Sequence, residues 1–168
     1  MAIRKASKDD ASSLAALSIE VWIGTYLRNG VSKFFADYAL SAFTVGKFET
    51  LIEDENEIIL VSDNRDGIDG FVRVTVKSPA PIENGPETEV ATLYVQPQHR
   101  GKGIGKRLLV EAFRLCSEKG YKGVWLAVNS ENRDAIVFYH RLGFTQDGQT
   151  AFRIGDQSYA NEVMVKRF

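Results

Sequence analysis

A stretch rich in glycine and basic residues, from Gln96 to Lys106, is the part of the sequence best suited to chemistry, and we call it the glycine loop. It contains Gly101, Gly103 and Gly105 and lies between an expected strand and an expected amphipathic helix. Glycine lets a ligand approach the backbone without meeting a Cβ atom, and the first N–H groups of a helix have no partner within it. The loop has three basic residues and no acidic one. It therefore predicts a binding site for an anion such as phosphate.

The spacing of the glycines excludes two common phosphate-binding motifs. The dinucleotide fingerprint G-x-G-x-x-G, started at Gly101, needs glycine at position 106, where Lys106 stands. The P-loop G-x-x-x-x-G-K-[ST] fails at the same position. The pattern that remains is Arg100-x-x-Gly103-x-Gly105.

Two motifs resemble the GNAT superfamily of N-acetyltransferases. The pattern at Arg100 is similar to that family's Q/R-x-x-G-x-G/A motif, which follows the fourth strand and binds the pyrophosphate of acetyl-coenzyme A through backbone amides. The segment from Asn132 to Phe144, NRDAIVFYHRLGF, is similar to the family's N-x-x-A-x-x-F-Y-x-x-x-G-F motif. The resemblance implies an acetyl-coenzyme A dependent N-acetyltransferase of the GNAT fold.

The resemblance implies a cofactor site made largely of backbone. The backbone of Leu93 to Val95 would form hydrogen bonds with the pantetheine arm, as in the addition of a strand to a sheet. The Arg100 and Lys102 side chains would reach phosphate or remain solvated, and Asn132 would contact the pantetheine or cap its own helix. The residues expected to bind acetyl-coenzyme A are Leu93, Tyr94, Val95, Arg100, Gly101, Lys102, Gly103, Ile104, Gly105, Lys106, Asn132 and Tyr139.

Aminolysis of a thioester needs a deprotonated amine and a proton for the departing thiolate. The resemblance implies that Tyr139 is the general acid, and the alternative is a core aromatic residue with its hydroxyl at the surface. Counting back from Arg100, Glu89 matches the glutamate base of histone-type members. The alternative for Glu89 is an exposed strand-end carboxylate. Glu87 is the fallback base. Many close sequences carry a further acid where Ala91 stands here, so the proton route stays open.

A weaker resemblance to PaiA-type spermidine/spermine acetyltransferases suggests the acceptor. It lies in Leu17 to Glu20, in Tyr38 to Phe43 and in the Gly155-Asp156 turn, and it implies a polyamine. Trp22 and Tyr26 are four residues apart on one helix face, so they line the acceptor site or belong to the core. Five acids between residues 49 and 57 would attract a polycation or simply form a solvated face.

Other activities stay open at this point. Cys116 lies on an apolar helical stripe, which favours an inert thiol and direct acetyl transfer in a ternary complex. His99 and His140 have no evident partners and are expected at the surface. The alternatives to a small-molecule enzyme are an acetyltransferase for protein N-termini or lysines, and a non-catalytic acyl-coenzyme A sensor.

The patterns along the chain predict a mixed α/β domain. Under the family resemblance this becomes a twisted, mostly antiparallel sheet of about seven strands flanked by about four helices. Strands are expected at 2–6, 57–62, 68–77, 88–95, 124–128, 144–150 and 162–166, and helices at 8–27, in pieces over 31–54 with an interruption at Gly46, from 104 to a stop at Gly120, and at 132–142.

Composition sets the remaining expectations. The 168 residues, with 44% hydrophobic side chains and a net charge of −1, predict one globular domain, 1–168, without nucleic acid as a partner. A single cysteine excludes an internal disulfide. One cysteine and two histidines also make a metal site unexpected. No signal peptide or membrane-spanning segment is recognisable, so we expect a cytoplasmic protein. The family resemblance allows a homodimer.

Overall fold

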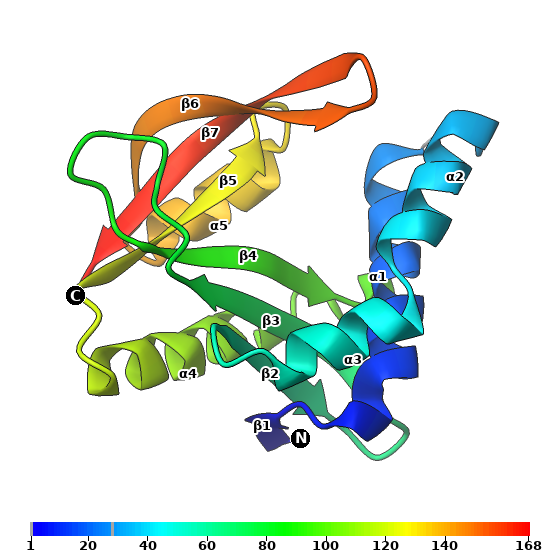
Figure 1. Cartoon of the computed structure of the whole chain (residues 1–168), viewed down its shortest axis with the longest axis horizontal. Coiled ribbons are helices and arrows are strands. Elements are labelled where there is room, and N and C mark those ends of the chain that lie inside the picture. The colour runs from blue at the N-terminus through cyan, green and yellow to red at the C-terminus, as the bar shows by residue number, and fades with distance from the viewer. Residues whose placement is uncertain (1, 28) are drawn as a thin grey trace. The chain divides into compact units, whose positions relative to one another are not determined.

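The computed structural model describes residues 2–27 and 29–168 (Figure 1). Seven strands form one sheet in the order β1-β2-β3-β4-β5-β7-β6, and the mixed α/β class predicted from the sequence is confirmed. The elements are β1 (Ala2–Lys5), α1 (Ala11–Tyr26), α2 (Lys33–Ala42), α3 (Val45–Glu53), β2 (Glu57–Asp63), β3 (Ile68–Val76), β4 (Thr88–Val95), α4 (Ile104–Glu118), β5 (Gly123–Asn129), α5 (Arg133–Arg141), β6 (Thr145–Ile154) and β7 (Gln157–Arg167), with short 3-10 helices at Lys8–Asp10 and Pro97–His99.

The chain forms two compact units. The N-terminal unit comprises residues 1–73 and 92–112, and the C-terminal unit comprises residues 74–91 and 113–168. β3, β4 and α4 each contribute residues to both units. The N-terminal unit thus contains the whole glycine loop, and the C-terminal unit contains Glu89 and Tyr139.

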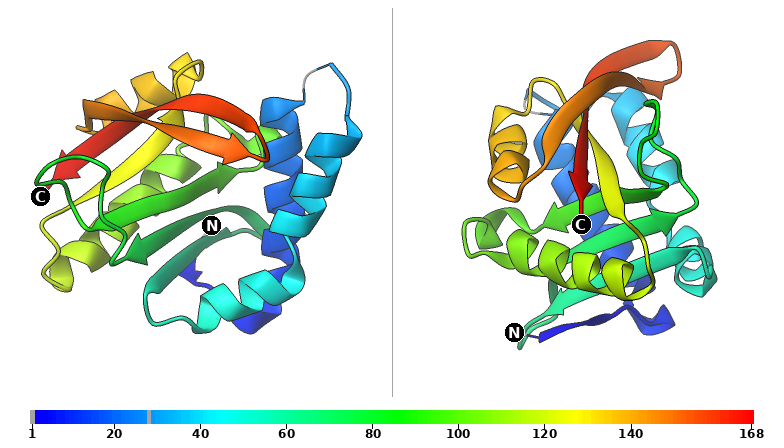
Figure 2. Two further views of the ribbon diagram at one scale, coloured as in Figure 1. Left: turned by 45° about the horizontal axis from the view of Figure 1, so that its top comes forward. Right: turned by 90° about the vertical axis from the view of Figure 1, so that its left-hand side faces the viewer.

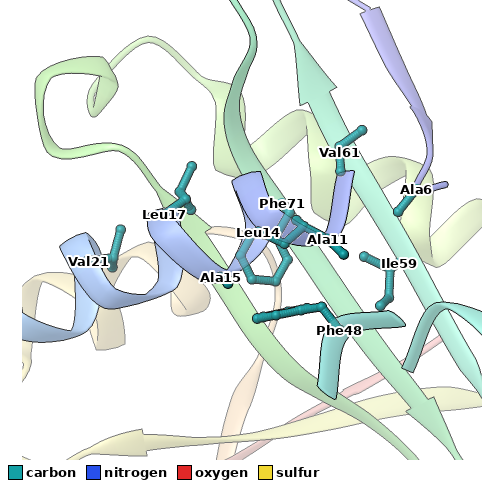
Figure 3. Close-up of a cluster of buried hydrophobic side chains, with 10 residues drawn as sticks. All are labelled: Ala6, Ala11, Leu14, Ala15, Leu17, Val21, Phe48, Ile59, Val61 and Phe71. Carbon is teal, nitrogen blue, oxygen red and sulfur yellow. The ribbon is translucent and has the colours of Figure 1, made fainter. Parts of the chain in front are cut away.

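The core of the N-terminal unit lies between α1, α3 and the strands β2 and β3 (Figure 3). Apolar residues recur on α1 at helical spacing, from Ala11 through Leu14 and Ala15 to Val21, and all are buried. Phe48 of α3 meets Phe71 of β3 edge to face, with ring centroids 6.0 Å apart. Removing this apolar surface from water is the main term that stabilises the unit.

A break between α2 and α3 falls earlier than the sequence indicated. The predicted interruption at Gly46 is wrong, because Gly46 lies inside α3. The chain leaves the helical conformation at Phe43 and Thr44, and the Thr44 hydroxyl accepts a hydrogen bond from the Lys47 N–H at 3.3 Å. This N-cap starts the new helix and tolerates the glycine that follows.

The C-terminal unit is built on β5, β7 and β6. β5 and β7 are antiparallel, and β6 and β7 form a long hairpin, coloured orange to red in Figure 2. Trp125, Val163 and Val165 form a buried cluster with Ala80 and Ile82 of the β3–β4 loop. The strands predicted at 144–150 and 162–166 prove too short, because the hairpin continues to the expected turn at Gly155 through residues that alternate between exposed and half-buried or buried in β6 and are mostly exposed in β7.

Candidate active site

The glycine loop adopts the backbone conformation that an anion site requires. Gly101 and Gly103 both have φ of +76°, a left-handed conformation that glycine adopts at little cost. Both are exposed, and a Cβ atom on either would meet no other atom within 4 Å. α4 begins directly afterwards at Ile104, whose side chain is buried at 1% exposure. The loop is therefore anchored at Ile104 and open at the glycines.

The loop carries positive charge at its surface. Arg100, Lys102 and Lys106 are all exposed, and Gly105 is half-buried. The first N–H groups of α4, a helix of 15 residues, add the positive end of the helix dipole. The open glycines, the N-terminus of α4 and the absence of acids in the loop fit the pyrophosphate of coenzyme A.

The end of β4 leads into this loop. Leu93, Tyr94 and Val95 are half-buried. The Tyr94 ring packs edge to face against Phe71, at a centroid distance of 5.7 Å, and against Phe43, at 6.5 Å. The aromatic ring thus belongs to the core of the N-terminal unit, and any contact of Tyr94 with a pantetheine arm would come from its backbone.

Glu89 is held in a specific hydrogen-bonded arrangement within the C-terminal unit. It lies on β4 opposite Trp125 in the parallel pairing with β5. Its Oε2 atom accepts a hydrogen bond from the Ser78 hydroxyl at 2.7 Å, and the Ser78 carbonyl accepts one from Trp125 Nε1, also at 2.7 Å. This chain of contacts fixes one carboxylate oxygen. Glu87, the fallback base, is exposed.

Tyr139 lies on α5 in an aromatic setting. Its ring contacts Phe138 and Phe144 at centroid distances of 5.2 and 5.5 Å. Burial raises the pKa of its hydroxyl above the ordinary tyrosine value, so the group stays protonated near neutral pH. Asn132 caps the same helix, because its Oδ1 atom accepts a hydrogen bond from the Ala135 N–H at 3.2 Å. A further contact of Asn132 with a ligand remains a prediction.

The two aromatic residues expected near the acceptor differ in their exposure. Trp22 is 3% exposed and contacts Tyr26, Phe35, Tyr38 and Phe43, which favours its interpretation as a core residue. Tyr26 is 36% exposed at the edge of this cluster. Of the pair, Tyr26 is the one that presents a ring to the surface.

Three further side chains are informative. Burial raises the pKa of the Cys116 thiol to about 11, which keeps it un-ionised and supports direct transfer. The histidines have partners that the sequence did not reveal. His140 Nδ1 lies 3.0 Å from the Phe144 carbonyl oxygen, and His99 Nδ1 lies 3.4 Å from a carboxylate oxygen of Asp69. A partner 30 residues away along the chain leaves no local pattern to detect.

A hollow of about 120 Å³ in the N-terminal unit also escaped the sequence analysis. Two basic residues, Lys47 and Arg73, and the rings of Phe43 and Phe71 contribute to its lining. Arg73 forms an ion pair with Glu57 at 3.1 Å, so its charge is already partly matched. The lining combines residues of α1, of the end of α2 with α3, of β3 and of β4, and these parts of the chain are far apart in the sequence.

Among the residues that the structure describes, no three His, Cys, Asp or Glu side chains are grouped to hold a metal ion. Over the same residues, no helix combines the length and the apolar character needed to cross a membrane.

Comparison with known proteins gives a consistent result. The model of the Acetyltransferase (GNAT) family matches residues 24–144, which is most of the chain. An uncharacterized N-acetyltransferase of Methanocaldococcus jannaschii is 29% identical over 144 residues, and the match spans 86% of this chain but only 60% of that relative.

Two further similarities concern Thermoplasma acidophilum. Its spermidine N(1)-acetyltransferase is 25% identical over 176 residues, which cover 99% of this chain and 96% of the relative. A crystal structure of a PaiA N-acetyltransferase from the same organism, in complex with coenzyme A, has a TM-score of 0.81 at 24% identity and covers 99% of this chain and 98% of its own. At this identity the structural likeness establishes the fold.

Proposed function

The chain belongs to the acetyltransferase (GNAT) family, and we propose that it transfers the acetyl group of acetyl-coenzyme A directly to a primary amine of a small molecule. The observation that carries this proposal is the glycine loop. Gly101 and Gly103 have positive φ, lie open to solvent and precede the N-terminus of α4. We further propose that residues 1–168 act as one domain in the cytoplasm, with a homodimer as the expected assembly.

In this proposal the glycine loop binds the donor and β4 orients it. Backbone N–H groups from Gly101 to Gly105 hold the pyrophosphate, and Leu93 to Val95 pair with the pantetheine amides. Acetyl-coenzyme A supplies the thioester. The amine nitrogen forms a C–N bond to the acetyl carbonyl carbon, and the C–S bond to coenzyme A breaks. The protein then has to accept a proton from the amine and stabilise the leaving sulfur.

We assign to Glu89 the role of the general base, which accepts the proton from the amine. Free alkylamines have pKa values of about 10, so the acceptor arrives mostly protonated at neutral pH. The Ser78 hydroxyl occupies one position on Oε2 of Glu89 and fixes the carboxylate. The remaining lone pairs of the carboxylate are then available to the amine, directly or through water. Ser78, itself held by Trp125, thus acts as a positioning residue.

A pair of matched substitutions tests this assignment. Glu89→Gln removes the base and preserves size, so we expect kcat to fall by about 100-fold or more. Glu87→Gln makes the same chemical change two residues away on an exposed side chain, and we expect a change of less than about threefold. The rates are compared across mildly alkaline pH, because a larger deprotonated fraction of the amine should partly rescue Glu89→Gln. The opposite ranking of the two variants would make Glu87 the base.

We assign to Tyr139 the role of the general acid, which donates a hydrogen bond to the leaving sulfur of coenzyme A. Its raised pKa keeps the hydroxyl protonated, so it enters the reaction as a hydrogen-bond donor. A thiolate is a good leaving group with a pKa of about 8.5 by analogy with cysteine, and a weak acid suffices to stabilise it. The aromatic contacts to Phe138 and Phe144 fix the ring.

For the acceptor we propose a polyamine. The supporting observations are the similarity to a spermidine N(1)-acetyltransferase and the exposed ring of Tyr26, which offers a cation a favourable surface. Thiol release from acetyl-coenzyme A with spermidine, spermine, putrescine, aminoglycosides, amino acids and a lysine peptide tests the class. Turnover that depends on polyamines supports the proposal, and turnover confined to another amine class overturns the choice of acceptor.

One observation favours a second acceptor class. The hollow of about 120 Å³ has Lys47 and Arg73 in its lining, and these would attract a carboxylate rather than a polycation. An acceptor that carries both an amine and a carboxylate, such as an amino acid or a peptide, would suit it. In the same panel this alternative predicts turnover with amino acids or the peptide, and a loss of that turnover in Arg73→Gln.

A further inference from the structure

A buried carboxylate without a role in the proposed reaction lies next to the glycine loop. Asp69 is on β3, and its side chain is completely shielded from solvent. Burying an ionised carboxylate is costly unless hydrogen-bond partners compensate for the lost water. Its Oδ2 atom accepts a hydrogen bond from Asn64 Nδ2 at 2.9 Å and lies 3.4 Å from His99 Nδ1. The placement of this charge therefore calls for an explanation.

Asp69 and its neighbour Gly70 contact the glycine loop and its flanks at three points. The Asp69 carbonyl accepts a hydrogen bond from the Gln96 N–H at 2.9 Å, where the loop begins. The Asp69 carboxylate meets His99 in the middle of the segment. A Cβ atom on Gly70 would lie 3.1 Å from Cγ2 of Ile104, so the first residue of α4 packs directly over this glycine. Two adjacent residues of β3 thus support the beginning, middle and end of the loop.

The charge of Asp69 is maintained by its surroundings. Burial by itself would raise the pKa of Asp69, but the polar groups of Ser62, Asn64 and His99 outweigh that effect, and the pKa lies below its ordinary value. The group is therefore a carboxylate at neutral pH. A hydrogen bond from the His99 ring to a charged acceptor is stronger than one to a neutral acceptor.

We infer that Asp69 is a positioning residue for the donor: through His99 and Gln96 it fixes the glycine loop in the conformation that presents the N–H groups of Gly101 to Gly105 to the pyrophosphate. A loop that is ordered before binding loses less conformational entropy when the ligand arrives. The inference rests on the proposed function, which supplies the ligand. It adds that a side chain remote from the ligand controls affinity for the pyrophosphate part and leaves the pantetheine part unaffected.

The test compares two ligands in matched variants. Asp69→Asn removes the charge at nearly constant size, and Asp66→Asn makes the same change at an exposed position in the β2–β3 turn. Binding of coenzyme A is measured by isothermal titration calorimetry, and binding of pantetheine, which lacks the pyrophosphate, by NMR titration. We expect Asp69→Asn to raise the Kd for coenzyme A about tenfold, or ~1.4 kcal/mol. The Kd for pantetheine, and both values in Asp66→Asn, should change by less than about twofold.

His99→Gln is a second variant in case Asp69→Asn folds poorly. His99 is partly exposed, and in His99→Gln the buried Asp69 carboxylate still accepts its hydrogen bond from Asn64. This variant should raise the Kd for coenzyme A selectively, and the double variant should lose no more than Asp69→Asn alone. Equal losses for coenzyme A and pantetheine would show a general structural role and overturn the inference. If the wild-type chain binds coenzyme A and the Kd is unchanged in both Asp69→Asn and His99→Gln, the inference is overturned but the proposed function is not. A wild-type chain that binds no coenzyme A would overturn the proposed function as well.

Discussion

Gly103→Ala probes the backbone of the glycine loop by itself. Gly103 has φ of +76°, and an added Cβ atom would touch nothing within 4 Å, so the substitution introduces conformational strain without a clash. The left-handed conformation costs a residue with a Cβ atom ~1–2 kcal/mol relative to glycine. This cost lowers the total free energy released when the unfolded chain folds and then binds coenzyme A.

The cost is divided between two measurable quantities. If the free loop keeps its conformation in the variant, the free energy of unfolding falls; if the free loop relaxes, the affinity for coenzyme A falls instead. We expect the two losses to sum to ~1–2 kcal/mol, equivalent to about 5- to 30-fold in an equilibrium constant. Urea unfolding of the free protein and calorimetric titration with coenzyme A give both numbers.

A matched control is available in α3. Gly46→Ala also adds a Cβ atom in open space, but within a helix, where alanine is favoured over glycine by ~0.5–1 kcal/mol. It should gain stability and leave the Kd for coenzyme A unchanged. A summed loss below about 0.5 kcal/mol in Gly103→Ala would refute the reasoning that the positive φ of the loop is required for binding.

Two further predictions concern charge and thiol reactivity. The Arg4 guanidinium holds the pKa of Asp10 at about 2, below its ordinary value, so the contribution of this pair to stability is complete above about pH 4 and is lost as the pH falls toward 2. Urea unfolding should therefore show Asp10→Asn to be less stable than wild type by ~2 kcal/mol at pH 7 and by much less near pH 2.5; an equal difference at both pH values contradicts this. Because burial raises the pKa of Cys116 to about 11, the native protein should not react with a disulfide reagent at pH 8, whereas the urea-unfolded chain should release one equivalent of thiol, and rapid labelling of the native protein contradicts the assignment.

Elements with strong local signals could be predicted from the sequence. The apolar run at 124–128 corresponds to β5, Gly123–Asn129, and the segment expected as a helix at 132–142 corresponds to α5, Arg133–Arg141. Both have a clear hydrophobic period and a terminating signal nearby. The glycine loop could be predicted because the spacing of its glycines and the helix that follows are both local in the sequence.

Features that depend on tertiary contacts could not be predicted. The β6–β7 hairpin extends through Gln157 and Ser158, which are exposed and polar and carry no apolar signal for a strand. The core position of Trp22 is set by rings from α2 and the segment after it. The contact between Asp69 and His99 joins two polar residues 30 positions apart, and neither stands out locally.

The most direct test of the account is the turnover of Tyr139→Phe with acetyl-coenzyme A and the preferred amine, measured together with the Kd for coenzyme A. The account predicts that kcat falls by about 100-fold or more while the Kd stays within about twofold, because only the hydrogen bond to the leaving sulfur is lost. Unchanged turnover in the variant, or wild-type protein that binds coenzyme A without any amine-dependent thiol release, would contradict it.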